Sequence, residues 1–476
     1  MSSKTVFICA DHGLALIYFL QGRVVPRLVE AGIEVVMLVE DDIREQLAAR
    51  HGQPGLVFEG LRAGLASEYA SRESKELQWW LQFLRRVGGS GDINTEAMDS
   101  YIRQVAVEEA IGRRVWMPLA WLAIALLRRS AAVRGRLIEI QRRFAPSIYA
   151  DLFERYRPAL VVASTPGWRL DRYLLREATR RSVQTATVIV GWDNPSSYGL
   201  PGAPVDWATC WSKIQKQELI LGSDWAPDRV NIGGIPPYDG YFRREWLMSR
   251  EEYYRLHGLD PDRKLLSYAC SFVSFAPNLR NVTALARLVS EDGLAAPCQL
   301  LVRPHPNHFL NVPFFIRERE DIRQLAREHR HVHVVEPVPL GKNLSYYSGE
   351  DMPEKSSMLA HSDVFVTVYS TMVVEAAIHE RPIVSLCLDT PGGWGHRRKY
   401  SLPLSKIGNW PTHSRFRVAH AGRAVLSEPD LREAINVYLE DPQADAEPRR
   451  EFIEREVTFT DASAGGRTGQ FLLGLL

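Results

Sequence analysis

The amino-acid sequence predicts an α/β protein made of two doubly wound domains, with a helical insertion in the first. Three observations support this prediction. The chain opens with the order strand, turn, helix, strand. A second cycle of the same kind starts at Lys264, past the middle of the chain. The strands of both cycles are continuous apolar runs, which is typical of parallel strands that are buried on both faces.

The first domain is predicted to cover residues 1–240. Its opening helix ends at Gly32, a residue suited to the left-handed turn that follows many helices. The predicted elements are, in order, a strand at 5–10, a turn at 11–13, a helix at 14–31, a strand at 33–39 and a mostly helical insertion at about 60–155. A strand at 159–164, a helix at 169–181 and strands at 185–190, 207–211 and 230–232 follow.

A segment rich in proline and glycine, 236–240, interrupts this alternation. We therefore predict a linker at 241–262 and a second domain at 263–476. The predicted elements of the second domain are strands at 264–270, 298–302, 331–335, 364–368 and 383–387 and helices at 281–291, 316–328 and 371–379. The two domains are similar in size, and we expect them to face each other over a cleft.

Composition argues against several classes of function. The formal net charge is +1 over 476 residues, so we expect no nucleic-acid partner. Five scattered cysteines lie mostly in apolar runs, which indicates buried thiols in a reducing compartment. No metal-ligand cluster is evident, and we expect neither a metal nor a cofactor. The chain opens without an export leader, which predicts a cytoplasmic protein.

Polar residues follow two strands of the second domain. Arg303 and His305 come directly after one strand, and Ser370 and Thr371 stand where another strand meets a helix, with Glu375 one turn further on. A guanidinium, an imidazole, hydroxyls and helix amides together suit a phosphorylated ligand. The alternatives are that Arg303 pairs with a local acid, that His305 caps a neighbouring element, and that the two hydroxyl residues are an ordinary helix cap.

The first domain offers a candidate general base. Asp11 and His12 end the first strand, and Gly13 follows them. An imidazole oriented by a carboxylate can accept a proton from an acceptor hydroxyl. The alternative is a plain turn built from Asp-His-Gly, since neighbours in sequence need not touch.

A second candidate segment follows the strand at 185–190. Asp193 is a further candidate catalytic residue, Asn194 stands beside it, and the rings of Trp192 and Tyr198 are candidates to stack on an acceptor sugar. The alternative is an Asx-turn beside a core tryptophan.

Three segments of the second half carry a resemblance to a known superfamily. Ser370-Thr371…Glu375-Ala376…Arg381-Pro382-Ile383-Val384 resembles the recurrent signature of GT-B glycosyltransferases, whose fold is two Rossmann-like domains facing a cleft. Arg303-Pro304-His305-Pro306 resembles the RxHP loop of bacterial surface-polysaccharide enzymes, among them CDP-glycerol glycerophosphotransferases and capsule or lipopolysaccharide transferases. The segment 460–467 resembles the closing segment of that group. Glu380 and Arg381 depart from the small residue usual there, and the Glu-x(7)-Glu pattern of retaining enzymes is absent around Glu375.

The resemblance implies that the second domain binds a nucleotide-sugar donor. It makes Arg303, His305, Ser370 and Thr371 phosphate contacts and Glu375 a ribose contact. Glu336 is then expected near the base, and Ser271 is expected to face the cleft.

The function implied by this resemblance is transfer of a sugar to a glycan or lipid-linked acceptor in surface polysaccharide biosynthesis. A glycerophosphotransferase that uses CDP-glycerol is a close variant. A UDP-GlcNAc 2-epimerase shares the architecture and is the second hypothesis. A degenerate, non-enzymatic assembly protein is the third.

The insertion carries a basic and apolar stretch at 113–143. From residue 111 to residue 143 the sequence has eight arginines and one acid, around an apolar run that includes Trp116 and Trp121. This pattern fits a helix lying in the plane of an anionic membrane, which predicts peripheral attachment to the inner face of the cytoplasmic membrane. The alternative is a helix buried against the first domain with solvated arginines.

Overall fold

The computed structural model describes residues 4–271, 278–338, 351–368, 370–388 and 408–476. The chain forms two compact units, one made of Met1–Asp239 and Val457–Leu476 and the other of Gly240–Glu456. The final stretch thus belongs with the first unit, whereas the sequence analysis placed it in the second domain. The predicted linker at 241–262 belongs to the second unit, and it contains the end of the helix Asp239–Phe242 and the whole of the helix Arg250–His257.

The first unit is built on a seven-stranded parallel sheet with the order β3-β2-β1-β4-β5-β6-β7. The strands are β1 Thr5–Cys9, β2 Glu34–Val39, β3 Leu56–Gly60, β4 Leu160–Ala163, β5 Gln184–Val188, β6 Trp207–Cys210 and β7 Val230–Ile232. From β1 the chain runs outward to β3 and then returns to β4 on the other side of β1. The carboxyl ends of β1 and β4 therefore flank the point where the strand order reverses, which is where open α/β sheets bind ligands.

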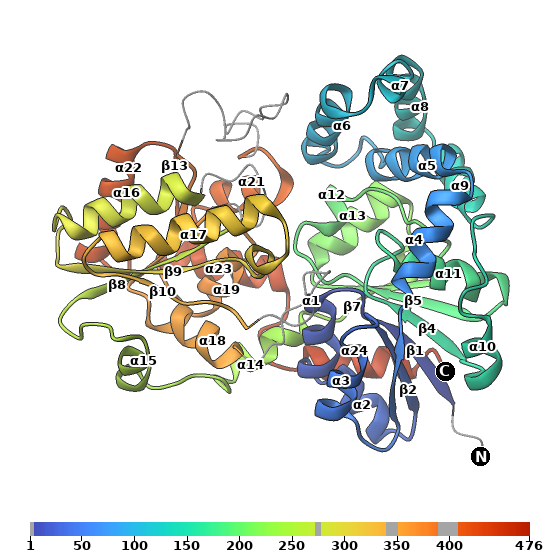
Figure 1. Cartoon of the computed structure of the whole chain (residues 1–476), viewed down its shortest axis with the longest axis horizontal. Coiled ribbons are helices and arrows are strands. Elements are labelled where there is room, and N and C mark those ends of the chain that lie inside the picture. Colours follow the sequence, from blue (N-terminus) through green and yellow to red (C-terminus); the bar gives the residue numbers. More distant parts are fainter. Residues whose placement is uncertain (1–3, 272–277, 339–350, 369, 389–407) are drawn as a thin grey trace. The chain divides into compact units, whose positions relative to one another are not determined.

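Helices pack on both sides of this sheet (Figure 1). They are α1 Gly13–Leu16, continued by a π-helical turn at Ile17–Gln21, then α2 Val24–Glu30, α3 Arg44–His51, α10 Ala150–Tyr156, α11 Asp171–Arg180, α12 Asn194–Ser197, α13 Lys213–Ser223 and α24 Ala464–Leu473. One core cluster joins Phe7 and Val161 of the sheet to Leu152 of α10 and Leu174 of α11, all of them buried. Burial of these apolar side chains fixes the sheet register from which the site residues project.

The insertion between β3 and β4 is helical, as its sequence predicts. It consists of α4 Ala63–Arg72, α5 Lys75–Val87, α6 Glu96–Glu108, α7 Ile111–Arg114, α8 Met117–Arg129 and α9 Ala131–Gln141. α5, α6 and α8 share a small core that includes Phe83, Ile102 and Ile124. Figure 1 shows α6, α7 and α8 at the end of the first unit that lies away from the sheet.

The last helix of the chain packs against α2 in the first unit. The Asp239 carboxylate accepts hydrogen bonds from the amides of Ala464 and Gly465, at 3.0 and 2.9 Å, and so caps the start of α24. A Cβ atom at Gly465 would lie 2.0 Å from the carbonyl oxygen of Gly22. This close backbone approach requires glycine, and it explains why the end of the chain belongs to the first unit.

The second unit repeats the plan with a six-stranded parallel sheet of order β10-β9-β8-β11-β12-β13. The strands are β8 Lys264–Ala269, β9 Cys298–Arg303, β10 Val332–Val334, β11 Val364–Thr367, β12 Ile383–Leu386 and β13 Arg423–Val425. The helices are α14 Asp239–Phe242, α15 Arg250–His257, α16 Asn278–Ser290, α17 Pro313–Glu328, α18 Met352–His361, α19 Met372–Ile378, α21 Pro411–Val418, α22 Glu428–Glu440 and α23 Ala446–Val457. The strand order is that of a doubly wound, Rossmann-like domain, with the reversal between β8 and β11.

Candidate functional site

The reversal point of the first sheet carries a buried Asp-His pair. Asp11 and His12 follow β1, and the Nδ1 of His12 lies 2.8 Å from the Oδ1 of Asp11. An ionised carboxylate only accepts hydrogen bonds, so this contact places the proton on Nδ1 and leaves Nε2 as the acceptor nitrogen. Within the described part of the chain Nε2 has no hydrogen-bond partner, and His12 is 8% exposed. The two neighbours do touch, and the role of His12 as a general base stays a prediction.

Several donors hold the carboxylate in place. The Ser164 hydroxyl, after β4, donates to Oδ1 of Asp11 at 2.9 Å, and the Leu170 amide donates to Oδ2 at 3.1 Å. The Arg169 Nε lies 3.5 Å from Oδ1. These groups come from the loop between β4 and α11, so the reversal of strand order brings together residues about 150 positions apart.

Electrostatics favour an ionised Asp11 beside a neutral His12. Burial alone would raise the pKa of Asp11, but the hydrogen bond from His12 and the charge of Arg169 outweigh burial and hold the pKa below its usual value. Burial lowers the pKa of His12, and Arg169 lowers it further, while Asp11 opposes both. The net shift is downward, so the imidazole is neutral and able to accept a proton at pH 7.

A second buried carboxylate, that of Asp171, organises the same loop. It accepts hydrogen bonds from the Thr165 amide at 2.9 Å, the Thr165 hydroxyl at 2.6 Å and the Arg169 amide at 3.1 Å. Burial, and then the neighbouring charge of Asp11, raise the pKa of Asp171 to about 7. Asp171 fixes the backbone that presents Arg169 and Leu170 to the Asp-His pair.

The segment after β5 is built mainly as a turn. The Asn194 side-chain oxygen accepts from the Gly191 amide, three residues earlier, at 2.7 Å and so closes the turn between β5 and α12. Trp192 is only 2% exposed, so its ring offers no free face to a sugar. Tyr198 stacks on Trp168 with ring centroids 5.3 Å apart. Asp193 is half-buried just before α12. The roles of these four residues stay predictions, and the burial of Trp192 agrees with the core tryptophan named as the alternative.

In the second unit Arg303 lies in a cluster of acids. It is 6% exposed, and its guanidinium forms ion pairs with Asp351 and Glu354 at the start of α18. Glu354 also accepts from the Tyr253 hydroxyl at 2.9 Å. Burial raises the pKa of Glu354, and the charge of Arg303 opposes this. Arg303 is thus paired with acids, as in the alternative considered from the sequence, and its role as a phosphate contact stays a prediction.

His305 caps the 3-10 turn Pro306–Phe309 that follows it. Its Nδ1 accepts from the Asn307 amide at 3.1 Å, and its own amide donates to Nδ1 of His308 at 3.0 Å. Burial, followed by the charges of His308, Arg303 and Lys355, lowers the pKa of His305 to about 3. His305 is therefore a neutral, locally bonded imidazole, and its role as a phosphate contact stays a prediction.

Glu375 is engaged by two donors within the second unit. Its Oε2 lies 2.6 Å from the Tyr241 hydroxyl and 2.6 Å from the Lys355 Nζ, and the residue is 6% exposed. Lys355 stands on α18 one residue after Glu354, so the two ion-paired clusters are adjacent. The predicted ribose contact of Glu375 therefore competes with a buried ion pair in this structure.

The other predicted donor contacts have local roles. Ser370 Oγ accepts from the Met372 amide at 3.2 Å, while Thr371 is the half-buried residue that begins α19. The backbone of Ser271 bonds to Asn278 at 3.0 and 2.9 Å. Glu336 forms a two-pronged ion pair with Arg323, at 2.6 and 2.8 Å. The roles of these four residues as donor contacts stay predictions.

Sequence reasoning missed several residues that the structure brings to these strand ends. They are Ser164 and Arg169 in the first unit and Tyr241, Lys355 and His308 in the second. His308 is fully buried, with its Nε2 2.7 Å from Glu318. The sequence 304–308, with two histidines around Pro306 and Asn307, was the available signal for His308. The other residues stand on elements far from their partners in sequence, and no local pattern marks them.

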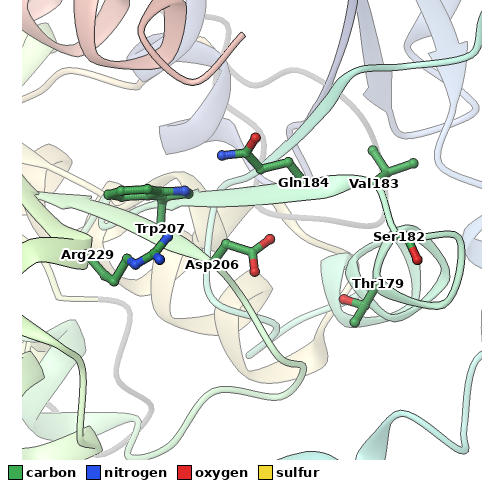
Figure 2. Close-up of a pocket in the computed structure, with 7 residues that line it drawn as sticks. All are labelled: Thr179, Ser182, Val183, Gln184, Asp206, Trp207 and Arg229. Carbon is green, nitrogen blue, oxygen red and sulfur yellow. The ribbon is translucent and has the colours of Figure 1, made fainter.

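The described residues also line a shallow pocket of about 330 Å³ at the amino ends of β5 and β6 (Figure 2). The Arg229 guanidinium lies 4.3 Å from the ring centre of Trp207 there, and the Asp206 carboxylate accepts from the Thr185 amide and hydroxyl, each at 2.9 Å. The two charged groups of this pocket, on Asp206 and Arg229, are thus engaged within the protein. It lies at the sheet edge opposite Asp11 and His12.

No protein-family model and no curated protein matches the chain. Solved structures do. A UDP complex of MnaA from S. aureus matches with 12% identity and a TM-score of 0.53, covering 99% of this chain and 98% of that one. The UDP-GlcNAc 2-epimerase from Neisseria meningitidis, bound to UDP-GlcNAc, matches with 11% identity and a TM-score of 0.52, covering 99% and 100%.

A glycosyltransferase from Rickettsia africae matches over similar lengths, with 10% identity, a TM-score of 0.51 and coverage of 100% of this chain and 98% of that one. Identities this low show the fold and nothing finer. Together with the strand orders of the two sheets, they establish that the chain has the GT-B fold of two Rossmann-like domains.

Proposed function

We propose that the protein is a glycosyltransferase that moves a sugar from a nucleotide-sugar donor to a hydroxyl of a glycan or lipid-linked acceptor in surface polysaccharide biosynthesis. The observation that carries the proposal is the Asp11–His12 pair. The buried, ionised carboxylate of Asp11 lies 2.8 Å from the neutral imidazole of His12, at the reversal point of the first sheet. Such a pair can act as a general base that takes the proton of an acceptor hydroxyl.

The proposed step uses His12 as general base. Nε2 takes the proton of the acceptor hydroxyl while the acceptor oxygen bonds to the anomeric carbon of the donor. The bond from that carbon to the nucleotide phosphate breaks, and the nucleoside diphosphate leaves with the electron pair. Asp11 stabilises the imidazolium that forms, because its ionised carboxylate accepts a hydrogen bond from the Nδ1–H group.

We propose that the donor binds at the strand ends of the second unit. Arg303, His305 and Lys355 gather there, close enough for the two cations to lower the pKa of His305. A nucleoside diphosphate can replace Asp351 and Glu354 as the partner of the guanidinium, since phosphate and carboxylate accept the same two-pronged hydrogen bonds. The hydroxyls of Ser370 and Thr371 are the remaining proposed phosphate contacts.

The test is a panel of nucleotide sugars, with CDP-glycerol included, incubated with simple glycosides and polyprenyl-linked glycans. Release of the nucleotide and the mass of the product are measured. The proposal requires a donor and an acceptor that together give a new glycoside. It also requires that His12→Gln lowers this rate at least 100-fold, while His51→Gln at the end of α3 leaves it unchanged. Transfer of a glycerophosphate in place of a sugar would instead identify the CDP-glycerol variant.

A UDP-GlcNAc 2-epimerase is the second candidate. It is favoured by the match to the Neisseria meningitidis epimerase over the whole chain. One experiment distinguishes the transferase from the epimerase: UDP-GlcNAc is incubated with the protein and no acceptor. Conversion to the 2-epimer without any acceptor, followed by proton NMR, supports the epimerase and contradicts the transferase.

A further inference from the structure

The helical insertion presents an uncovered apolar surface, which we call the α7–α9 face. Its members are large apolar side chains between 36% and 76% exposed. They are Ile111, Val115, Trp116, Leu119, Trp121, Leu122, Leu126, Val133 and Ile140. Exposed leucines scattered singly are ordinary, but nine such residues on consecutive short helices form a patch of the kind that marks an interaction site.

The helix α8 is apolar on both of its sides. Met117, Ala120, Ile124 and Leu127 are buried, the first three of them in the core shared with α5 and α6. Leu119, Leu122 and Leu126 follow one another at intervals of three and four residues, so they line the opposite side of the helix. A helix that is apolar all round is normally buried on every side. The outward side of α8 is therefore an apolar surface that no other described element of the chain buries.

The charges around this face are mostly positive, and half of its arginines have no compensating acid among the described residues. Three arginines form ion pairs inside the first unit: Arg113 with Glu76, Arg128 with Asp99, and Arg134 with Asp224. Arg114, Arg129, Arg136 and Arg143 are exposed and form no ion pair within the described part of the chain. Glu139, paired with Arg142, is the one acid from residue 111 to residue 143.

We propose that the α7–α9 face lies in the surface of an anionic lipid bilayer. Apolar side chains enter the boundary of the acyl chains, the tryptophans sit at the level of the headgroups, and the unpaired arginines contact anionic headgroups. No helix among the described residues is long and apolar enough to cross a membrane. α8, with its 13 residues, accordingly lies along the surface.

Charge decides between a membrane and a second copy of the chain. A symmetric dimer through this face would bring the unpaired arginines of both copies together, where they repel each other. An anionic lipid surface supplies the opposite charge. The inference concerns an element separate from Asp11 and His12, and it does not depend on the proposed reaction.

The test is sedimentation of the full-length protein with vesicles of phosphatidylcholine alone, or of phosphatidylcholine and phosphatidylglycerol at about three to one. Three double variants are compared with the wild type. Leu119→Gln with Leu122→Gln removes apolar contact, and Arg129→Gln with Arg136→Gln removes charge. The matched control, Leu65→Gln with Leu256→Gln, alters leucines that are 50% and 59% exposed on α4 and α15.

The wild type and the control are expected to bind the anionic vesicles at least tenfold more tightly than the neutral ones, with binding that weakens as salt is added. The leucine variant should lose at least tenfold in affinity. The arginine variant should lose roughly 25-fold, since each arginine near an anionic surface contributes about fivefold. Because every altered side chain is exposed, the three variants should have the same melting temperature as the wild type.

Three results would overturn the inference. One is absence of vesicle binding, and another is equal binding to neutral and anionic vesicles. The third is a dimer of the wild type, seen in sedimentation velocity, that the leucine variant abolishes while vesicle binding is unchanged. That last result would assign the face to a second copy of the chain.

Discussion

The electrostatics of the Asp11–His12 pair predict opposite effects for two substitutions that remove neighbouring charges. If His12 is the base, activity falls at low pH as the imidazole becomes protonated. The midpoint of that fall in kcat/KM reports the pKa of His12 in the free enzyme. Asp11 raises this pKa and Arg169 lowers it. Asp11→Asn should therefore move the midpoint to lower pH, and Arg169→Gln should move it to higher pH.

The size of the first shift follows from the contact distance. Oδ1 of Asp11 and Nδ1 of His12 are 2.8 Å apart. With charge centres about 4 to 5 Å apart and an effective dielectric constant of about 20, the interaction is roughly 3 to 4 kcal/mol, or about 2 to 3 on the pH scale. Arg169 has a side chain that is 41% exposed and so is screened by water, and we expect a smaller shift of at most about 1.

The assay is the pH dependence of kcat/KM between pH 4 and pH 8, with Arg172→Gln on α11 as the matched arginine control. Asp11→Asn should also reduce kcat by about 10²- to 10⁴-fold, because the amide no longer stabilises the imidazolium or fixes its tautomer. The reasoning is refuted if the two substitutions shift the midpoint in the same direction, or if Asp11→Asn leaves it in place.

Three further predictions concern stability, measured by denaturant unfolding. Arg303→Met leaves two buried carboxylates without their cation and should lower the free energy of unfolding by about 3 to 5 kcal/mol, and unchanged stability would show that Arg303 serves a ligand alone. Lys355→Met should lower it by about 3 kcal/mol by leaving the Glu375 carboxylate with one donor fewer, and a double variant with Glu375→Gln should recover part of this loss. Gly465→Ala places a Cβ 2.0 Å from a backbone oxygen and should lower the free energy of unfolding by several kcal/mol, whereas Gly466→Ala, with nothing within 4 Å, should lower it by less than about 1 kcal/mol. Equal effects of the two substitutions would contradict the tight packing of α24.

The sequence predicts the fold well where strands are buried on both faces. β1, β8, β9 and β11 read as continuous apolar runs, and the residues that follow them could be named in advance. β3 was missed because it is an edge strand whose residues alternate between buried and half-buried, with Glu59 near its end. An alternating run of five residues does not read as a buried strand.

The candidate site was predictable only in its position. In an open parallel sheet the ligand site lies at the carboxyl ends of the strands where the strand order reverses, which here are β1 and β8 and their neighbours. Asp11 and His12 follow the first strand directly, so they could be placed at such a site. The acids that engage Arg303 lie 48 and 51 residues away from it, at the start of α18. Nothing in the local sequence around Arg303 indicates this pairing, because ion pairs between distant elements depend on how those elements pack.

Trp192 illustrates a different limit. An aromatic residue after a buried strand suits either a sugar-stacking ring or a core side chain, and the two possibilities share the same sequence pattern. Packing decides between them, and Trp192 is buried. The α7–α9 face is the reverse case. The exposure of Leu119, Leu122 and Leu126 shows that one side of α8 is not buried, whereas the sequence also allowed a helix buried against the first domain.

The most direct test of the account is the turnover of the identified donor and acceptor by His12→Gln, compared with the wild type at saturating donor. The side chain of glutamine keeps a polar atom in place but accepts no proton at neutral pH. The account predicts a fall in kcat of at least 100-fold with donor binding preserved. A His12→Gln enzyme that transfers sugar at the wild-type rate would contradict it.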